Sequence, residues 1–144
     1  MLNLSIERFF LFDPLALFFL VVIFIISLPS FVYSFSYLKG EYPVSKVFSA
    51  QILLFVFVLS MAFVVSVSNC LVFLIFWEIM SLVSYFLVVF DTNNERSIKA
   101  GLVYIVMTHI GTAFIIAAFM ILYNHAHSFD FMAVKNACSI MPQR

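Results

Sequence analysis

The chain contains 144 residues, of which 65% are hydrophobic and 10% are charged, and its mean hydropathy is +1.18. Soluble domains carry about 25% charged residues, so this composition excludes an ordinary soluble domain and indicates an integral membrane protein. The basic and acidic residues are equal in number, so the chain has no positive surplus with which to bind nucleic acid.

Four segments of the chain are long and apolar enough to cross a bilayer as helices, which takes about 20 residues each. Residues 1–14 precede them as a non-membrane segment that ends in Asp13 and Pro14, a side-chain cap and a proline suited to the first helical turn. We expect an all-α integral membrane fold, with a four-helix transmembrane unit over residues 15–123. Its spans are expected at residues 15–38, 45–68, 70–90 and 100–123.

Pro29 lies inside the first expected span, where a proline removes one backbone hydrogen bond. Membrane helices tolerate such a proline when a neighbouring group satisfies the freed carbonyl. We expect a kink at this position, with the hydroxyl of Ser27 or Ser30 bonding to that carbonyl.

Four spans place both termini on the same side of the membrane, and the basic residues indicate which side. The two turns on the opposite side carry Lys39, Lys46, Arg96 and Lys99. Cytoplasmic loops are enriched in Lys and Arg, so we expect these turns in the cytoplasm. The sequence thus predicts a multi-pass protein of the cell inner (cytoplasmic) membrane, with its termini on the non-cytoplasmic side.

Residues 124–144 form a tail that is too polar to cross the membrane. Apolar side chains recur in it at helical spacing, at Phe131, Val134, Cys138 and Met141. We therefore expect a short helix that lies in the membrane interface. The tail also contains His125 and His127, but too few further ligands lie near them to predict a metal site.

Glu78 places a carboxylate near the middle of the third expected span, within the run LIFWEIMSLVSYF. Such a residue costs roughly 2.5–3.5 kcal/mol at the bilayer centre, so it usually faces a protein interior or water. Ser81 and Tyr85 follow on approximately the same face of the helix. The alternative is a neutral carboxyl group that is hydrogen-bonded into a helix interface and has no transport role.

His109 on the fourth expected span lies at a depth that could bring it to Glu78, roughly 14 Å in from the start of its helix. Thr112 lies one turn beyond the histidine, and Gly111 would let another helix approach closely. A carboxylate, an imidazole and several hydroxyls at one depth are the groups that a proton relay requires. For the histidine alone, the alternative is an inert imidazole that donates to a neighbouring carbonyl.

Two motifs on the third and fourth expected spans characterise the chain further. FWE is followed by S-x-x-S-Y over residues 76–85, and THIG occurs on the next span at residues 108–111. Together with FDPLALFF and YLKGEY around the first span, these motifs resemble the antiporter-like membrane subunits of respiratory complex I, Mrp-type cation/proton antiporters and membrane-bound hydrogenases. THIGTAF is most similar to the hydrogenase-4 component B and formate hydrogenlyase subunit 3 group of that family.

The resemblance implies that Glu78 corresponds to the family's essential membrane glutamate. In full-length members this glutamate pairs with a lysine on the following broken helix and switches its protonation state during ion transfer. Lys99, at the start of the fourth span, does not match that lysine. The chain resembles four consecutive helices of a larger subunit, so we expect a fragment or a split-gene piece.

The resemblance therefore implies part of a proton-translocating subunit in a hydrogenase-type or complex I-like respiratory membrane complex. Glu78 would carry the proton of a half-channel, with His109 as a relay and with Ser81, Tyr85 and Thr112 as pathway hydroxyls. Oxidoreductase activity would belong to the whole complex, because the chain itself offers no expected active site, cofactor or metal. Its partners would be other membrane subunits, a separate chain that carries the missing helices, and the lipid bilayer.

Two other interpretations of the sequence stay open. The chain could be a non-transporting remnant, or a structural or assembly membrane protein, that keeps the family's helices. It could also be an independent four-helix transporter that assembles with copies of itself. A neighbouring reading frame that begins with the broken lysine helix would favour the split subunit over the remnant.

Overall fold

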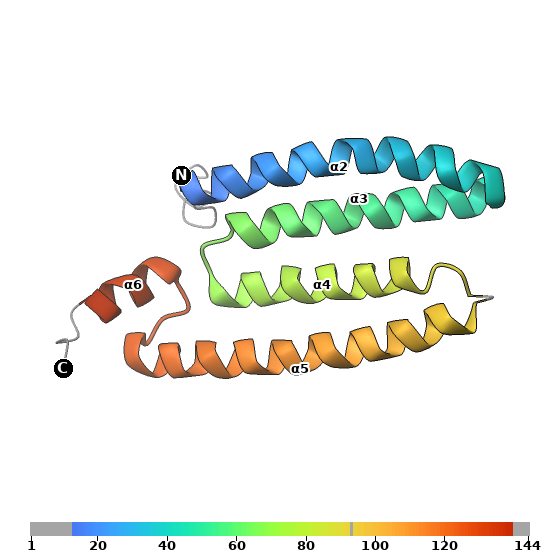
Figure 1. Cartoon of the computed structure of the whole chain (residues 1–144). Helices are drawn as coiled ribbons and strands as arrows, with labels where there is room; N and C mark the ends of the chain where they lie inside the picture. The colour runs from blue at the N-terminus through green and yellow to red at the C-terminus, as the bar shows by residue number, and fades with distance from the viewer. Residues whose placement is uncertain (1–12, 93, 140–144) are drawn as a thin grey trace.

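Four long helices lie side by side in chain order in the computed structural model, which describes residues 13–92 and 94–139 (Figure 1). They are α2 (Pro14–Glu41), α3 (Val44–Ser66), α4 (Cys70–Val88) and α5 (Glu95–Ala126), and a short helix follows as α6 (Phe131–Ser139). All four long helices are long and apolar enough to cross a membrane. The predicted all-α membrane fold is therefore confirmed.

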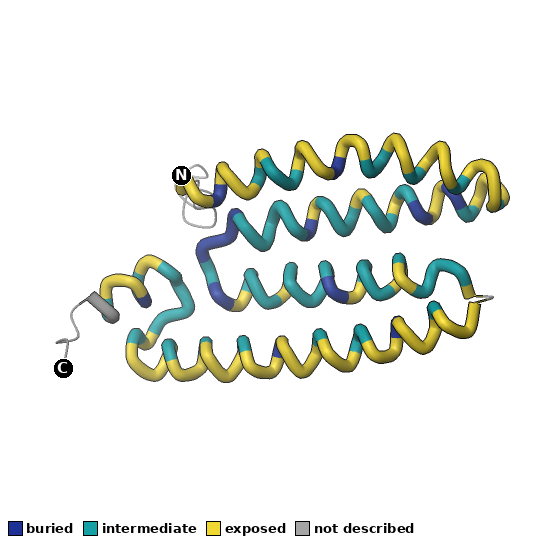
Figure 2. The backbone as a smooth tube through the Cα atoms, viewed as in Figure 1, coloured by how far each residue is buried: buried dark blue, intermediate teal, exposed yellow. Residues whose placement is uncertain are grey.

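The long helices form a single layer, in which each one packs on its neighbours in the sequence. The central helices α3 and α4 are partly covered, whereas α2 and α5 at the edges are exposed over most of their surface (Figure 2). Among the described residues no large side chain is fully buried, and the buried ones are small, such as Ala50, Ser60 and Cys70. Small side chains allow close helix packing in a membrane, where lipid or other helices cover the outer faces.

The bounds of the long helices differ by a few residues from those of the apolar runs. The largest difference is at α5, which begins at Glu95 because the Asn94 side chain accepts a hydrogen bond from the Arg96 backbone N–H, 3.0 Å away. The helix also runs past residue 123 to Ala126, and His127 then adopts a left-handed conformation with φ of 51°. At α5 the polar cap, rather than the apolar composition, thus determines where the helix begins.

The helix α2 starts where the sequence predicted, but the hydrogen bonding at its start differs from the prediction. Asp13 is the N-cap residue and Pro14 opens the helix, as expected. The Asp13 side chain, however, makes no capping hydrogen bond within the part of the chain that the structure describes. The expected side-chain cap is therefore wrong, and the fixed backbone angle of Pro14 is the local signal that remains for starting the helix.

The helix α2 continues through Pro29. The Ser27 hydroxyl donates to the Phe24 carbonyl over 3.2 Å, and the Ser30 hydroxyl donates to the Ile26 carbonyl over 2.7 Å. Serine hydroxyls in helices reach carbonyls three or four positions earlier, so these two bond to the groups on either side of the one that the proline frees. The expectation that they satisfy the freed carbonyl itself is wrong.

The turn between α3 and α4 is tied to the linker before α6. The Cys70 N–H donates to the Phe129 carbonyl over 2.8 Å, and the Phe131 N–H donates to the Ser68 carbonyl over 2.9 Å. Asn69 lies between these bonds and caps α4 by accepting from the Leu71 N–H over 2.9 Å. This pairing fixes the start of α4 next to the start of α6.

The helix α6 begins at Phe131, and Val134 is buried against the rest of the chain, so the predicted tail helix is confirmed. Its location in the membrane interface stays a prediction. Met141, which we also placed on this helix, and the non-membrane segment at residues 1–12 lie outside the described residues.

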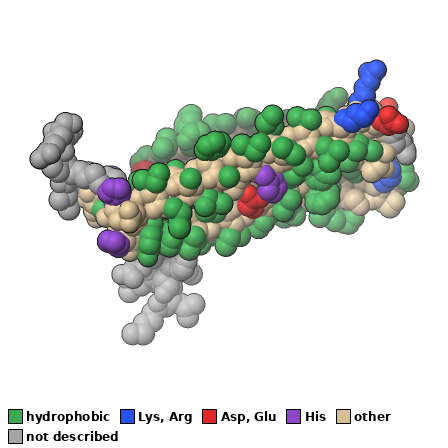
Figure 3. All heavy atoms as spheres, turned by 90° about the horizontal axis from the view of Figure 1, so that it is seen from below, with side chains coloured by type: hydrophobic (Ala, Val, Ile, Leu, Met, Phe, Trp, Pro, Cys, Tyr) green, Lys and Arg blue, Asp and Glu red, His purple; other side chains and the backbone are tan. Residues whose placement is uncertain are grey.

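At the opposite end of the layer the first and third turns meet. The Tyr42 and Phe90 rings lie edge to face with centroids 5.5 Å apart, and the Lys46 ammonium lies 5.6 Å above the Tyr42 ring. Desolvation by surrounding side chains, followed by the nearby carboxylates of Asp91 and Glu41, raises the pKa of the Tyr42 phenol. Figure 3 shows Lys and Arg side chains gathered at one end of the layer, which agrees with the basic turns.

Candidate functional site

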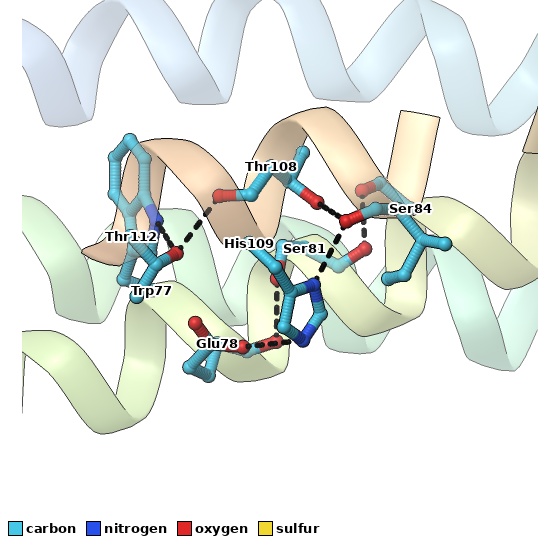
Figure 4. A network of polar contacts seen from close by, with 8 residues as sticks. Trp77, Glu78, Ser81, Ser84, Thr108, His109 and Thr112 are labelled. Atoms are coloured by element: carbon cyan, nitrogen blue, oxygen red, sulfur yellow. Dashed lines mark hydrogen bonds and ion pairs between the residues drawn. The ribbon is translucent and has the colours of Figure 1, made fainter. Parts of the chain in front are cut away.

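Glu78 lies near the middle of α4 and faces α5. Counting from the helix ends places it about 12 Å from Cys70 and about 15 Å from Val88 along the axis. One of its carboxylate oxygens, Oε2, lies 3.6 Å from Nε2 of His109 on α5 (Figure 4). The structure thus brings the two residues together at mid-span, as their depths in the sequence suggested.

The hydrogen bonding of His109 defines its neutral tautomer. Its Nδ1 lies 2.9 Å from the carbonyl oxygen of Ile105, one turn earlier on α5. A carbonyl oxygen can only accept, so Nδ1 carries a proton and Nε2 presents its lone pair to Glu78 when the ring is neutral. The pair can therefore hold one proton on either partner, as a carboxylic acid beside an imidazole or as a carboxylate beside an imidazolium.

The separation within the pair limits how a proton could move. Hydrogen bonds between nitrogen and oxygen usually span 2.7–3.2 Å, so about 3.6 Å is beyond direct contact. Transfer between Glu78 and His109 requires either a small approach of α4 and α5 or one bridging water. Glu78 and His109 are thus neighbours, and the distance between their side chains would have to change, or a water would have to bridge it, before a proton could pass.

The pair faces outward from the layer. The side chain of Glu78 is 32% exposed and that of His109 is 52% exposed. A hollow of about 510 Å³ lies beside them on the outer face of α5, and His109 is the one ionisable group among its lining residues, which are Ile105, Val106, His109, Ile110 and Ala113. In Figure 3 an acidic side chain and a histidine lie together amid hydrophobic side chains on this face.

Two of the predicted pathway hydroxyls lie within one turn of the pair. Ser81 is 3% exposed, and its hydroxyl donates to the Glu78 backbone carbonyl over 3.0 Å. Thr112 is 5% exposed, and its hydroxyl donates to the Thr108 carbonyl over 3.1 Å and accepts from the Trp77 indole N–H over 3.2 Å. Ser81 is therefore bonded to the backbone of Glu78, and Thr112 links α5 to Trp77, the residue before Glu78.

Tyr85 lies farther from the pair, two turns or about 10 Å along α4 from Glu78. Its ring packs on α5 at Gly101, where its Cε2 atom would be 3.2 Å from an added Cβ atom and Val89 would clash with it outright. The expected site of close approach, Gly111, has no atom within 4 Å of an added Cβ among the described residues. The close contact between α4 and α5 is therefore made at Gly101, whereas Gly111 lies on the exposed side of α5. The approach of another helix at Gly111 stays a prediction.

Sequence reasoning missed two hydrogen bonds that join the helices, Trp77 with Thr112 and Ser84 with Tyr104. The Ser84 hydroxyl donates to the Ser81 carbonyl, so the Tyr104 hydroxyl is the donor in the second bond. Both bonds follow the antiparallel register of the Glu78–His109 pair. In this register, residues with higher numbers on α4 lie beside residues with lower numbers on α5. Applying that register to all polar residues of the two spans would have identified them.

Two other ionisable residues that the structure describes, Lys99 and His125, lie away from this site. Lys99 lies 3.9 Å from Glu95 at the start of α5, and both side chains are largely exposed. His125 bonds through Nδ1 to its own helix, at the Ile121 carbonyl. Within residues 13–92 and 94–139, no three His, Cys, Asp or Glu side chains gather as a metal site would require.

Comparison with known proteins identifies two matching families. Residues 67–144, more than half of the chain, match the family described as NADH:quinone oxidoreductase/Mrp antiporter, TM. Residues 1–48 match the family described as NADH-Ubiquinone oxidoreductase (complex I), chain 5 N-terminus. The two matches together include the whole of α2, α4, α5 and α6 and the start of α3.

Individual relatives agree with these matches. The chain is 29% identical over 123 residues to hydrogenase-4 component B of Escherichia coli, which covers 85% of the chain and 18% of the relative. It is 30% identical over 133 residues to NADH-quinone oxidoreductase subunit L of Buchnera aphidicola, a match that covers 92% of the chain and 21% of the relative. It is also 30% identical over 123 residues to NADH-ubiquinone oxidoreductase chain 5 of Aedes aegypti, a match that covers 85% of the chain and 20% of the relative. The chain thus spans about a fifth of the length of these relatives.

Proposed function

Because the chain belongs to the NADH:quinone oxidoreductase/Mrp antiporter family of membrane proteins, we propose that it forms part of a proton-translocating subunit, with Glu78 and His109 as its proton-carrying pair. The observation that carries the proposal is the 3.6 Å separation of their side chains at mid-span, where ionisable groups are rare. The relatives' names support the setting, since they describe a hydrogenase component and subunits of quinone oxidoreductases.

The pair acts as a relay because a single proton can reside on either partner. With the proton on Glu78, both groups are neutral and the apolar surroundings favour them. With the proton on His109 Nε2, the two charges lie side by side and stabilise each other. Neither state leaves an isolated, unpaired charge in the membrane, because the proton stays within the pair.

The hydroxyls near the pair extend the pathway along α4. Ser81 lies one turn from Glu78 on the same helix, and Tyr85 lies one turn further towards the end that carries the basic turns. Thr112 adds a hydroxyl on α5 next to the pair. In this arrangement water and hydroxyl groups hand the proton between Glu78 and that end of the layer.

The exposure of the pair implies that other membrane helices cover it. An acidic side chain left facing lipid would cost roughly 2.5–3.5 kcal/mol, so a partner surface with polar groups is favoured there. Glu78 and His109 face outward beside the hollow on α5, which is where that partner would pack. We expect the partners to be other membrane subunits of a respiratory or hydrogenase-type complex.

The function can be tested in the assembled complex. An affinity tag on this chain would recover the complex from membranes, and reconstituted vesicles would report proton uptake through a pH-sensitive dye. Glu78→Gln should abolish the dye response and His109→Ala should reduce it strongly, whereas Glu78→Asp should keep part of it. Electron transfer in the same preparation would check that the complex is intact.

Three results would overturn the proposal. Unchanged proton uptake in Glu78→Gln, with normal electron transfer, would remove Glu78 from the pathway. Recovery of the tagged chain without any partner subunit would favour a non-transporting remnant or an assembly protein. If the chain alone showed Glu78-dependent proton flux in liposomes, it would instead be an independent transporter.

We also propose that the chain resides in the cell inner membrane with both termini on the non-cytoplasmic side. Single cysteines at Glu41 and Lys135, in a background without Cys70 and Cys138, would report the side of each position through an impermeant thiol reagent. Only the Lys135 position should label from outside the cell membrane. Labelling of both positions from one side would contradict the four-span topology.

A further inference from the structure

We propose that Trp77 and Thr112 form a clamp between α4 and α5 that fixes Glu78 against His109, so that both are positioning residues. The inference rests on the proposed function only in taking Glu78 and His109 to carry protons. The separation that the clamp controls is a property of the fold, and it can be measured without transport.

The clamp joins the two helices directly beside the pair. The Trp77 indole N–H donates to the Thr112 hydroxyl over 3.2 Å (Figure 4). Trp77 precedes Glu78 in the chain, and Thr112 lies almost one turn after His109 on α5. A hydrogen bond at this point therefore sets both the depth and the rotation of one helix against the other.

Both partners of the clamp are held by their own surroundings. Thr112 is 5% exposed and donates its proton to the Thr108 carbonyl, which leaves its oxygen as the acceptor for the indole. The Trp77 ring stacks on Phe73 with centroids 5.8 Å apart, and Phe73 in turn contacts Phe119 of α5 edge to face. An indole N–H away from water needs an acceptor, so its bond to Thr112 is strongly favoured over leaving it unpaired.

The Glu78–His109 contact is less able to hold this register itself. Its side chains are both partly exposed and lie 3.6 Å apart, so they can separate without breaking a good hydrogen bond. A slip of one residue between α4 and α5 would move the groups by about 1.5 Å along the axis and turn them by about 100°. The Trp77–Thr112 bond on one side of the pair, and the Ser84–Tyr104 bond two turns away on the other, oppose such a slip.

Solid-state NMR of the full chain in lipid bilayers can measure the separation itself. Glutamate would carry ¹³C at its side-chain carboxyl carbon and histidine would carry ¹⁵N in its ring, and the signal lost in Glu78→Gln identifies the Glu78–His109 coupling. Trp77→Phe and Thr112→Val should lower this dipolar coupling by about half or more, because it falls with the cube of the distance. Thr112→Ser keeps the accepting oxygen and should restore it.

Thr108→Val is the matched control, because the Thr108 hydroxyl donates to the Ile105 carbonyl of its own helix over 2.9 Å. It should leave the coupling unchanged, and circular dichroism should show equal helix content in all variants. The clamp is refuted if Trp77→Phe and Thr112→Val keep the parent coupling, or if Thr108→Val lowers it equally. If the Glu78–His109 coupling of the parent chain is present and depends on the clamp, but the complex does not translocate protons, the proposed function is wrong and the clamp still stands.

Discussion

The α2–α3 and α4–α5 helix pairs are built from similar residues but use their polar groups differently. On α2 and α3 the serine hydroxyls bond back to their own helices, as Ser27 does to Phe24 and Ser60 does to Phe57. Between α4 and α5 three pairs of polar side chains meet across the interface: Trp77 with Thr112, Glu78 with His109, and Ser84 with Tyr104. A hollow of about 390 Å³ with a mainly apolar lining remains between α2 and α3.

The comparison shows that polar content alone does not identify a site in a membrane helix. A hydroxyl that satisfies its own backbone contributes little to recognition between helices, because both helices are complete without it. A hydroxyl or indole that needs a partner on the next helix fixes depth and rotation. The α2–α3 pair is therefore held mainly by apolar packing, and α4–α5 has the polar specificity that a proton-carrying pair requires.

The largest expected effect concerns the close approach of α4 and α5 at Gly101. An added side chain there meets Val89 and Tyr85, so Gly101→Leu should lower the free energy of unfolding by about 1–3 kcal/mol. Unfolding in mixed micelles of a mild detergent and dodecyl sulfate, followed by circular dichroism, would measure it.

Gly111→Leu is the matched control for this substitution. No described atom lies within 4 Å of an added Cβ at Gly111, and leucine is the better helix former by up to about 1 kcal/mol. The control should thus be as stable as the parent chain or more stable. Equal losses in both variants would show that α5 does not approach α4 preferentially at Gly101.

A smaller effect is expected from the bond between Ser84 and Tyr104. Tyr104→Phe removes only the hydroxyl that donates across the interface, and such bonds between membrane helices contribute about 0.6 kcal/mol on average. Tyr33→Phe on α2 is the comparison, because Tyr33 is 69% exposed and stacks on Tyr37. The same unfolding assay should show a loss for Tyr104→Phe alone, and a similar change in both variants would contradict the difference between the two helix pairs.

The sequence predicted the parts of this site that depend on depth. Counting residues from the ends of two antiparallel spans was enough to bring Glu78 and His109 together, because each residue advances a helix by a fixed rise. The partner of Thr112 and the choice of Gly101 over Gly111 depend on how each helix is rotated. Spans that are apolar on all sides give no periodic signal for rotation, so these features required the structure.

The smallest effect on stability is expected for two serine substitutions, which compare a hydroxyl on the proposed proton pathway with a hydroxyl that only packs. Ser81 and Ser60 are 3% and 2% exposed, and each donates to a carbonyl three positions earlier in its own helix. Since these bonds lie within one helix, Ser81→Ala and Ser60→Ala should each change the free energy of unfolding by less than about 0.5 kcal/mol.

Their effects on transport should differ, because only Ser81 lies one turn from Glu78, with its hydroxyl on the Glu78 carbonyl. In reconstituted vesicles the initial rate of proton uptake should fall several-fold in Ser81→Ala and stay at the parent rate in Ser60→Ala. The equal stability of the two variants is what makes this comparison informative, since a lower rate then cannot come from a loosened fold. If both variants pump at the parent rate, Ser81 is a packing hydroxyl like those of α2 and α3, and the proton leaves Glu78 by another route.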